Sequence, residues 1–153
     1  MPTLPWFTVR DPEPGAESVI MASRFEVRSL RHVPSFFIAS MRLLRQARGA
    51  SGAIGVSLRA QPFRRTFWTL SAWTDKAALY AYAGTEPHKS TMVRQRSVMR
   101  DSTFVFWTVP AGDLPIDWDE AERRIAAQQA VQQREQRAGQ RDGRQGKGPA
   151  VAA

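Results

Sequence analysis

The chain has 153 residues, which is the size of one ordinary domain and enough to bury a hydrophobic core. It contains no cysteine, which excludes disulfides, thiolate metal sites and thiol nucleophiles. No apolar run approaches the roughly 20 residues that cross a bilayer, and the N-terminus lacks the basic start and apolar core of a signal peptide. We therefore expect a soluble, cytoplasmic protein without a membrane span.

The net charge of +8 raises the question of nucleic-acid binding, which depends on clustered lysine and arginine. Residues 1–118 carry 15 basic and 9 acidic side chains, and residues 119–153 carry 7 and 5. The excess is spread along the chain, and no compact basic tract appears. We expect the arginines to form a solvated surface and do not expect nucleic acid as a partner.

The first 16 residues contain four prolines and no periodic pattern, so they predict an irregular N-terminal arm. Residues 19–27 alternate as a strand does, and Pro34 then begins a helix that Gly49 ends. Two further alternating runs, at 54–58 and 66–73, form a hairpin around a turn at 61–65.

A second helix begins at Thr74 and Asp75 and ends at Gly84. A new helix then begins near Pro87, carries His88 and runs to about residue 98. With a last strand at 103–109, residues 17–110 have the order β-α-β-β-α-β, which predicts an α+β, ferredoxin-like domain with an antiparallel sheet. A polar helix follows at 117–137, and the composition of residues 138–153 predicts a disordered tail.

Both faces of this sheet are apolar, since aromatic residues occur at odd and at even positions of the strands at 66–73 and 103–109. Helices on one side would leave the other face in water. We therefore expect this second face to meet another sheet, most simply that of a symmetric copy, and predict a homodimer.

His88 is the residue whose chemistry best suits catalysis, because a neutral imidazole can accept a proton, bind iron or orient a polar substrate. The alternative is a capping turn with the imidazole at the surface. We expect an apolar ligand pocket whose other candidates are Trp73, Tyr82, Met92, Trp68, Phe104, Phe106 and Arg59. Core packing for the aromatic residues, and a sheet-edge charge for Arg59, are the alternatives.

The strand LSAW, the helix start TDKAALYAY and the later segment EPHKSTM resemble the layout of the dimeric α+β barrel superfamily. This superfamily includes the antibiotic biosynthesis monooxygenases, haem-degrading enzymes and the DUF3291 group, and the resemblance extends loosely to spheroidene monooxygenase. The resembling part is residues 17–110.

The resemblance implies a monooxygenase-like protein that acts on or binds a hydrophobic small molecule, with His88 as a base or, if haem is bound, as its axial ligand. The sequence itself requires no cofactor; haem is the one that the resemblance implies. Cofactor-free and haem-degrading relatives rely on an asparagine, and this chain has none. In the haem-degrading relatives a histidine occupies the position of Met92 and a tryptophan that of Tyr82. These differences favour the alternative, a non-catalytic homodimeric module that binds a small ligand or a partner.

Overall fold

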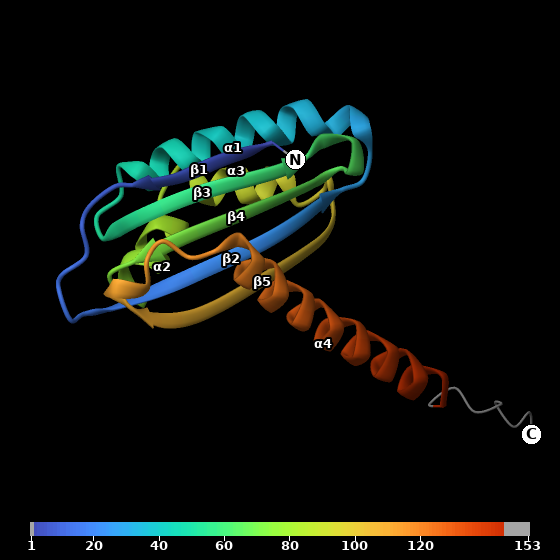
Figure 1. The fold of residues 1–153 in the computed structure, drawn as a ribbon. Coiled ribbons are helices and arrows are strands. Elements are labelled where there is room, and N and C mark those ends of the chain that lie inside the picture. The colour runs from blue at the N-terminus through green and yellow to red at the C-terminus, as the bar shows by residue number, and fades with distance from the viewer. Residues whose placement is uncertain (1, 146–153) are drawn as a thin grey trace, which may run out of the picture.

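The computed structural model describes residues 2–145, which form five strands and four α-helices (Figure 1). Their bounds are β1 Thr3–Thr8, β2 Glu17–Val27, α1 Val33–Arg48, β3 Ala53–Gln61, β4 Thr66–Trp73, α2 Lys76–Gly84, α3 His88–Gln95, β5 Met99–Pro110 and α4 Trp118–Gln145. From β2 to β5 the order is β-α-β-β-α-β, with the second helix split into α2 and α3, and this confirms the predicted ferredoxin-like α+β fold.

The five strands form one antiparallel sheet in the order β1-β3-β4-β2-β5. The longest pairing joins β2 to β5, which run beside each other from the Glu17–Pro110 pair to the Val27–Met99 pair. Because β5 ends this order, its outer edge is unpaired within the described chain. Side chains alternate between two faces, which we call the cavity face, under α1, α2 and α3, and the α4 face on the opposite side.

The N-terminal arm differs from the prediction, because residues Thr3–Thr8 form the edge strand β1 instead of an irregular segment. This strand pairs with β3, and the Trp6 indole lies against the backbone at Gly55. A Cβ at Gly55 would overlap that ring. Because Gly55 has no side chain, the Trp6 ring can occupy this space and pack on the core. Neither the sequence pattern of the N-terminal arm nor that of β3 predicts this contact.

The helix α1 covers the cavity face and buries Phe36, Ala39 and Ala47 against it. The rings of Phe36 and Phe67 lie 4.9 Å apart, and those of Phe36 and Phe25 lie 5.8 Å apart, so α1 is joined to β4 and β2 by aromatic contacts. The helix begins with a proline in its first turn and ends at Gly49, as the sequence predicts.

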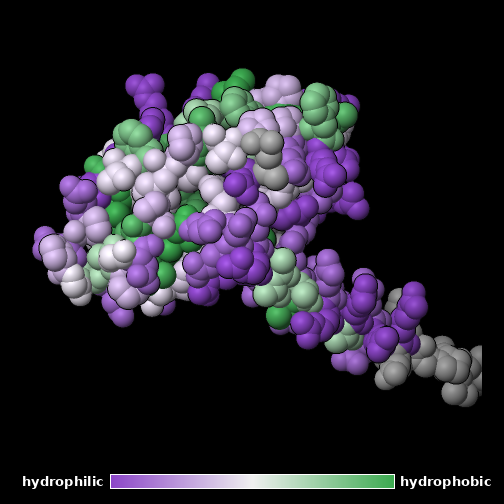
Figure 2. All heavy atoms as spheres, in the orientation of Figure 1, coloured by the Kyte–Doolittle hydropathy of each residue, from purple (hydrophilic) through white to green (hydrophobic). Residues whose placement is uncertain are grey.

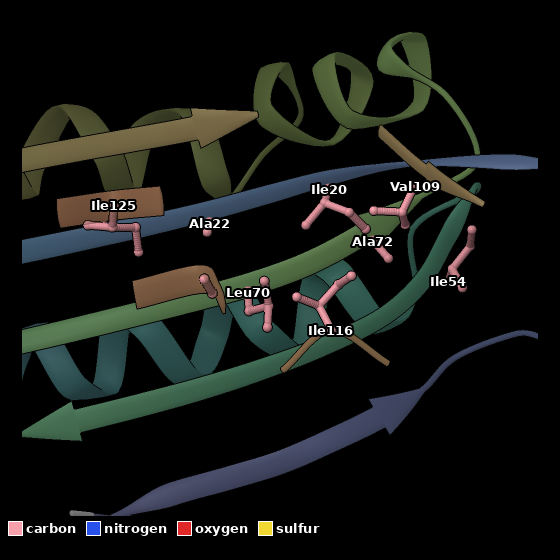
Figure 3. Close-up of a cluster of buried hydrophobic side chains, with 9 residues drawn as sticks. Ile20, Ala22, Ile54, Leu70, Ala72, Val109, Ile116 and Ile125 are labelled. Atoms are coloured by element: carbon pink, nitrogen blue, oxygen red, sulfur yellow. The ribbon is translucent and has the colours of Figure 1, made fainter. Parts of the chain in front are cut away.

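The helix α4 packs on the opposite face of the sheet and then extends away from the domain (Figure 1). Its first turns bring Ala121 and Ile125, with Ile116 from the preceding loop, onto a buried cluster (Figure 3). The other members come from the strands and are Ile20, Ala22, Ile54, Leu70, Ala72 and Val109. This face, which we expected to meet a second sheet, is therefore covered in part by the same chain.

The same helix is longer than the predicted 117–137, since it continues to Gln145. Of the tail predicted to be disordered, residues 138–145 are thus helical, and 146–153 lie outside the described residues. The extending part of α4 presents mostly hydrophilic side chains (Figure 2). No helix in the described chain has the length and hydropathy of a membrane span.

Candidate functional site

A cavity of about 220 Å³ lies between the cavity face of the sheet and helices α1, α2 and α3. Its floor consists of residues of β2, β3, β4 and β5, and its roof of residues from the three helices. Of the sequence candidates, the structure places His88, Trp73, Tyr82, Met92, Phe104 and Phe106 in its lining. These residues are far apart in the sequence, and the fold brings them together.

The break between α2 and α3 positions His88. The Asp75 carboxylate accepts a hydrogen bond of 2.8 Å from the Ala78 amide and so caps the start of α2, as predicted. The helix ends at Gly84, and the chain restarts as α3 with His88 as its first residue. The histidine thus stands at the N-terminal end of a short helix and beside the C-terminal turn of the preceding one.

Three aromatic rings form a continuous wall of the cavity. The Trp73 and Tyr82 rings stack with centroids 5.0 Å apart, and the His88 ring meets Tyr82 edge-on at 4.7 Å. The Trp73 side chain is fully buried, and the Tyr82 hydroxyl donates a hydrogen bond of 3.0 Å to the Leu43 carbonyl of α1. Burial raises the pKa of Tyr82 far above its ordinary value. The Tyr82 hydroxyl therefore stays protonated, and its proton is engaged in the hydrogen bond to α1.

The hydrogen bonding of His88 determines its tautomer. Its Nδ1 lies 3.1 Å from the Ala83 carbonyl oxygen, which can only accept a hydrogen bond, so Nδ1 carries the proton. Burial lowers the pKa of His88 below its ordinary value, and the hydrogen bond to Ala83 opposes this shift in part. The imidazole is accordingly neutral near pH 7, and its Nε2 bears a lone pair that no group of the described chain occupies.

The floor supplies hydroxyl groups. The Ser71 Oγ accepts a hydrogen bond of 2.9 Å from Trp73 Nε1, which leaves its own proton free to be donated. Ser23 and Thr69 hydrogen-bond each other across β2 and β4, and that pair also retains one hydroxyl proton. The cavity therefore has hydrogen-bond donors on the sheet and an acceptor, His88 Nε2, on the helices.

Two residues that the sequence pattern did not single out complete the wall formed by α3. Thr91 and Gln95 follow His88 by three and seven residues, and both line the cavity with Met92. The Gln95 Oε1 atom is buried without a hydrogen-bond partner. Helical spacing from His88 was the signal that could have identified them, because positions i, i+3, i+4 and i+7 share one face of a helix.

Arg59 and Trp68, which we expected in the ligand pocket, lie on the α4 face instead. The Trp68 side chain packs on the cluster under α4. The Arg59 guanidinium pairs with the Glu122 carboxylate at 2.6 Å and lies 4.9 Å from the Trp118 ring. The reason is strand alternation, which sends both residues to the face opposite Thr69 and Ser71, and their assignment to the pocket was wrong.

The residues around the cavity do not fit a haem. His88 Nε2 could be an axial ligand, but about 220 Å³ is below the roughly 300–1,000 Å³ of pockets that hold drug-sized molecules. None of the described lining residues carries a charge that could pair with the two carboxylates of a haem. Elsewhere in the described chain, no three histidine or acidic side chains gather as a metal site.

A family model described as "Domain of unknown function (DUF3291)" matches residues 39–136, which include all of the helical roof except the first turns of α1. Comparison with curated proteins finds no similar sequence.

Solved structures with the same fold include a mutant of SnoaB, a cofactor-independent oxygenase from Streptomyces nogalater. It is 17% identical, with a TM-score of 0.52 over 60% of this chain and 92% of that chain. PA3566 from Pseudomonas aeruginosa is 14% identical, with a TM-score of 0.56 over 62% and 96%. A third structure, of an antibiotic biosynthesis monooxygenase, is 16% identical, with a TM-score of 0.54 over 58% and 95%. At these identities the similarity shows the fold alone.

Proposed function

We propose, for a chain that belongs to the DUF3291 family, that the cavity binds a hydrophobic aromatic molecule through a ligand hydroxyl that donates to His88 Nε2. The observation that carries the proposal is the 3.1 Å contact of His88 Nδ1 with the Ala83 carbonyl oxygen, from which we infer that Nδ1 carries the proton and Nε2 is left as an acceptor. The apolar lining favours a flat hydrocarbon frame, because the exposed rings of Phe104 and Phe106 on β5 supply stacking surface.

The reaction that this arrangement supports is a cofactor-free monooxygenation. Among the structural neighbours, SnoaB is described as a cofactor-independent oxygenase and another protein as an antibiotic biosynthesis monooxygenase. His88 takes the hydroxyl proton, and the Ser71 hydroxyl stabilises negative charge on an oxygen of the resulting anion. Dioxygen is the oxidant. One of its atoms replaces the hydrogen of a ring carbon as a carbonyl oxygen, and the other leaves as water with that hydrogen and the hydroxyl proton.

Proton transfer to His88 is uphill from an ordinary phenol. The ordinary pKa values of a phenol and of histidine, about 10 and about 6.5, differ by about 3.5 units or roughly 5 kcal/mol, and burial of His88 widens the gap. The resting complex therefore holds the ligand as a hydroxyl compound that donates a hydrogen bond. Transfer occurs on the way to the transition state, within a barrier of the size that enzymes overcome.

A non-catalytic binding module is the second candidate. It is favoured by the partner of His88, because Nδ1 is held by a backbone carbonyl and not by a carboxylate, which would make Nε2 more basic. In this case the cavity would bind the same ligand without consuming oxygen.

The test uses 1-naphthol as the probe, with binding measured by calorimetry and turnover by oxygen consumption. A monooxygenase of this kind would convert 1-naphthol and dioxygen to 1,4-naphthoquinone and water in equal amounts, and His88→Leu would abolish the oxygen uptake. The matched control is His32→Leu, at the other histidine, which does not line the cavity. Binding without oxygen uptake would support the binding module, and a protein that does not bind 1-naphthol at all would refute both functions.

Assembly as a homodimer is part of this proposal. Phe104 and Phe106 lie beside the cavity on the edge strand β5, and their exposed fractions are 37% and 49%. A second copy on this edge would bury both rings and pair the free strand. Sedimentation velocity should show a dimer that Phe106→Lys dissociates, while Phe63→Lys, at a ring 92% exposed in the β3–β4 turn, leaves it intact. Only monomer at micromolar concentration would refute the assembly.

A further inference from the structure

The cavity wall formed by α3 has three polar positions. His88, Thr91, Met92 and Gln95 occupy positions i, i+3, i+4 and i+7, and all four line the cavity. Two helical turns separate His88 from Gln95, which corresponds to about 10 Å along the helix axis. The wall thus places one side-chain acceptor at each end, His88 and Gln95, with Thr91 and Met92 between them.

The side-chain amide of Gln95 is unusual because its oxygen, Oε1, is buried and has no hydrogen-bond partner in the described chain. Four side-chain polar atoms in the described chain are buried without a partner, on Ser18, Gln46, Gln95 and Trp107, and only Gln95 lines the cavity. A buried polar atom without a partner destabilises the folded chain, and nearly all such atoms in proteins are satisfied. A ligand in the cavity can supply the hydrogen bond that Gln95 Oε1 does not make within the described chain.

We propose that Gln95 Oε1 accepts a hydrogen bond from a second hydroxyl of the ligand, so that the cavity selects neutral aromatic molecules with hydroxyl groups at both ends. The inference rests on the proposed function, since it takes the first hydroxyl to be the one on His88. It makes Gln95 a specificity-determining residue.

The chemistry of the lining disfavours the other ligand classes. A carboxylate, sulfate or phosphate would be buried without a charged partner, because the described lining residues are uncharged. A ketone at the Gln95 end would face Oε1 as a second acceptor in the observed orientation of the amide, and would be satisfied only if the amide turned to present its Nε2 donor. A site with a buried acceptor discriminates strongly against an analogue that lacks the matching donor.

The experiment compares three ligands by calorimetry, 1-naphthol, 1,5-dihydroxynaphthalene and 5-methoxy-1-naphthol. The diol should bind the wild-type protein about tenfold tighter than 1-naphthol, from one hydrogen bond to an otherwise unpaired buried acceptor. About twofold of this is statistical, because the diol has two equivalent ends. The methoxy compound, which has the bulk but no second donor, should show no gain.

Gln95→Met removes the amide at nearly constant side-chain length. It should reduce the preference for the diol over 1-naphthol to about twofold. The matched control is Gln46→Met, because Gln46 also has a buried unpartnered oxygen but lies outside the cavity lining. This variant should keep the full preference. The melting temperature of each variant without ligand establishes that it is folded.

The two proposals fail in different ways. If wild type binds 1-naphthol but shows no preference for the diol, or if Gln95→Met keeps the preference, the role of Gln95 is refuted and the proposed function stands. Tighter binding of the methoxy compound than of the diol would also refute it. If the wild-type protein binds none of the three ligands, both proposals are wrong.

Discussion

Replacing Tyr82 by phenylalanine tests whether its hydroxyl belongs to the fold or to the chemistry. The hydroxyl donates to the Leu43 carbonyl at 3.0 Å, whereas the ring stacks on Trp73 and supports His88. Tyr82→Phe removes the hydrogen bond and keeps all three rings in contact. Because the hydroxyl is already bonded to α1, we expect this variant to lose stability and to bind and oxidise the ligand as wild type does.

The expected loss is about 1 kcal/mol. A neutral hydrogen bond contributes roughly 0.5–1.5 kcal/mol, and the Leu43 carbonyl, inside α1, keeps its helical bond to the amide four residues on, so no acceptor is left unpaired. For a chain of this length, 1 kcal/mol corresponds to roughly 2–4 °C in melting temperature. Tyr82→Ala should cost about 3–5 kcal/mol, because it also removes the ring and leaves a cavity.

Urea denaturation gives the free energies, and calorimetry with 1-naphthol gives the binding. Tyr80→Phe is the matched control for the stability measurement only, since Tyr80 lies on the same helix with 62% of its surface exposed but also lines the cavity. The reasoning would be refuted by a Tyr82→Phe variant of wild-type stability. Loss of ligand binding or oxygen uptake in a stable Tyr82→Phe would likewise show that the hydroxyl acts on the ligand.

Three further predictions follow from named contacts. Burial lowers the pKa of His88 in the folded protein, so the unfolded chain binds the proton first as the pH falls, and the free energy of unfolding should decline below about pH 6.5. Urea denaturation at several pH values should show a smaller decline in His88→Leu. Arg59→Ala removes the ion pair with Glu122 and the contact with Trp118, so it should cost about 1–2 kcal/mol of stability without changing the calorimetric affinity for 1-naphthol. A weaker affinity would show that Arg59 contributes to ligand binding. Gly55→Val should displace the Trp6 ring and cost about 1–3 kcal/mol, with faster proteolysis at β1, and an unchanged proteolysis rate would contradict the account of that strand.

The sequence predicts the parts of the fold that local signals specify. Alternation gives the strands and their faces, Asp75 and Gly84 delimit α2, and Pro34 and Gly49 delimit α1. These signals act over a few residues, through caps, turns and side-chain periodicity, and the structure follows them. The same alternation rule, applied to Trp68 and Trp73, would have shown that they lie on opposite faces and cannot share a pocket.

Other features depend on contacts between distant segments. The helix α1 has phenylalanines at 36 and 37, and helical spacing from Phe37 through Leu44 predicts the wrong one as buried, since Phe36 is 5% exposed and Phe37 is 43% exposed. Only the position of Phe25 and Phe67 on the sheet decides between them. Helical spacing from His88 places Gln95 on the cavity side of α3, but the burial of its side-chain oxygen without a partner depends on the assembled cavity, because a glutamine side chain is ordinarily solvated.

The arginine excess takes part in covering the α4 face of the sheet. The guanidinium carbons of Arg24, Arg59 and Arg124 lie 6.0, 4.9 and 4.6 Å from the ring centroids of Trp68, Trp118 and Trp107. Planar guanidinium groups stack on aromatic rings while their charge remains hydrated.

Three of the five tryptophans are thereby shielded from water on the face that we expected to require a second sheet. These three arginines, part of the positive charge that raised the question of nucleic-acid binding, thus make contacts within the chain. Since these arginines and α4 cover that face, the exposed rings of β5 are the stronger basis for the proposed dimer.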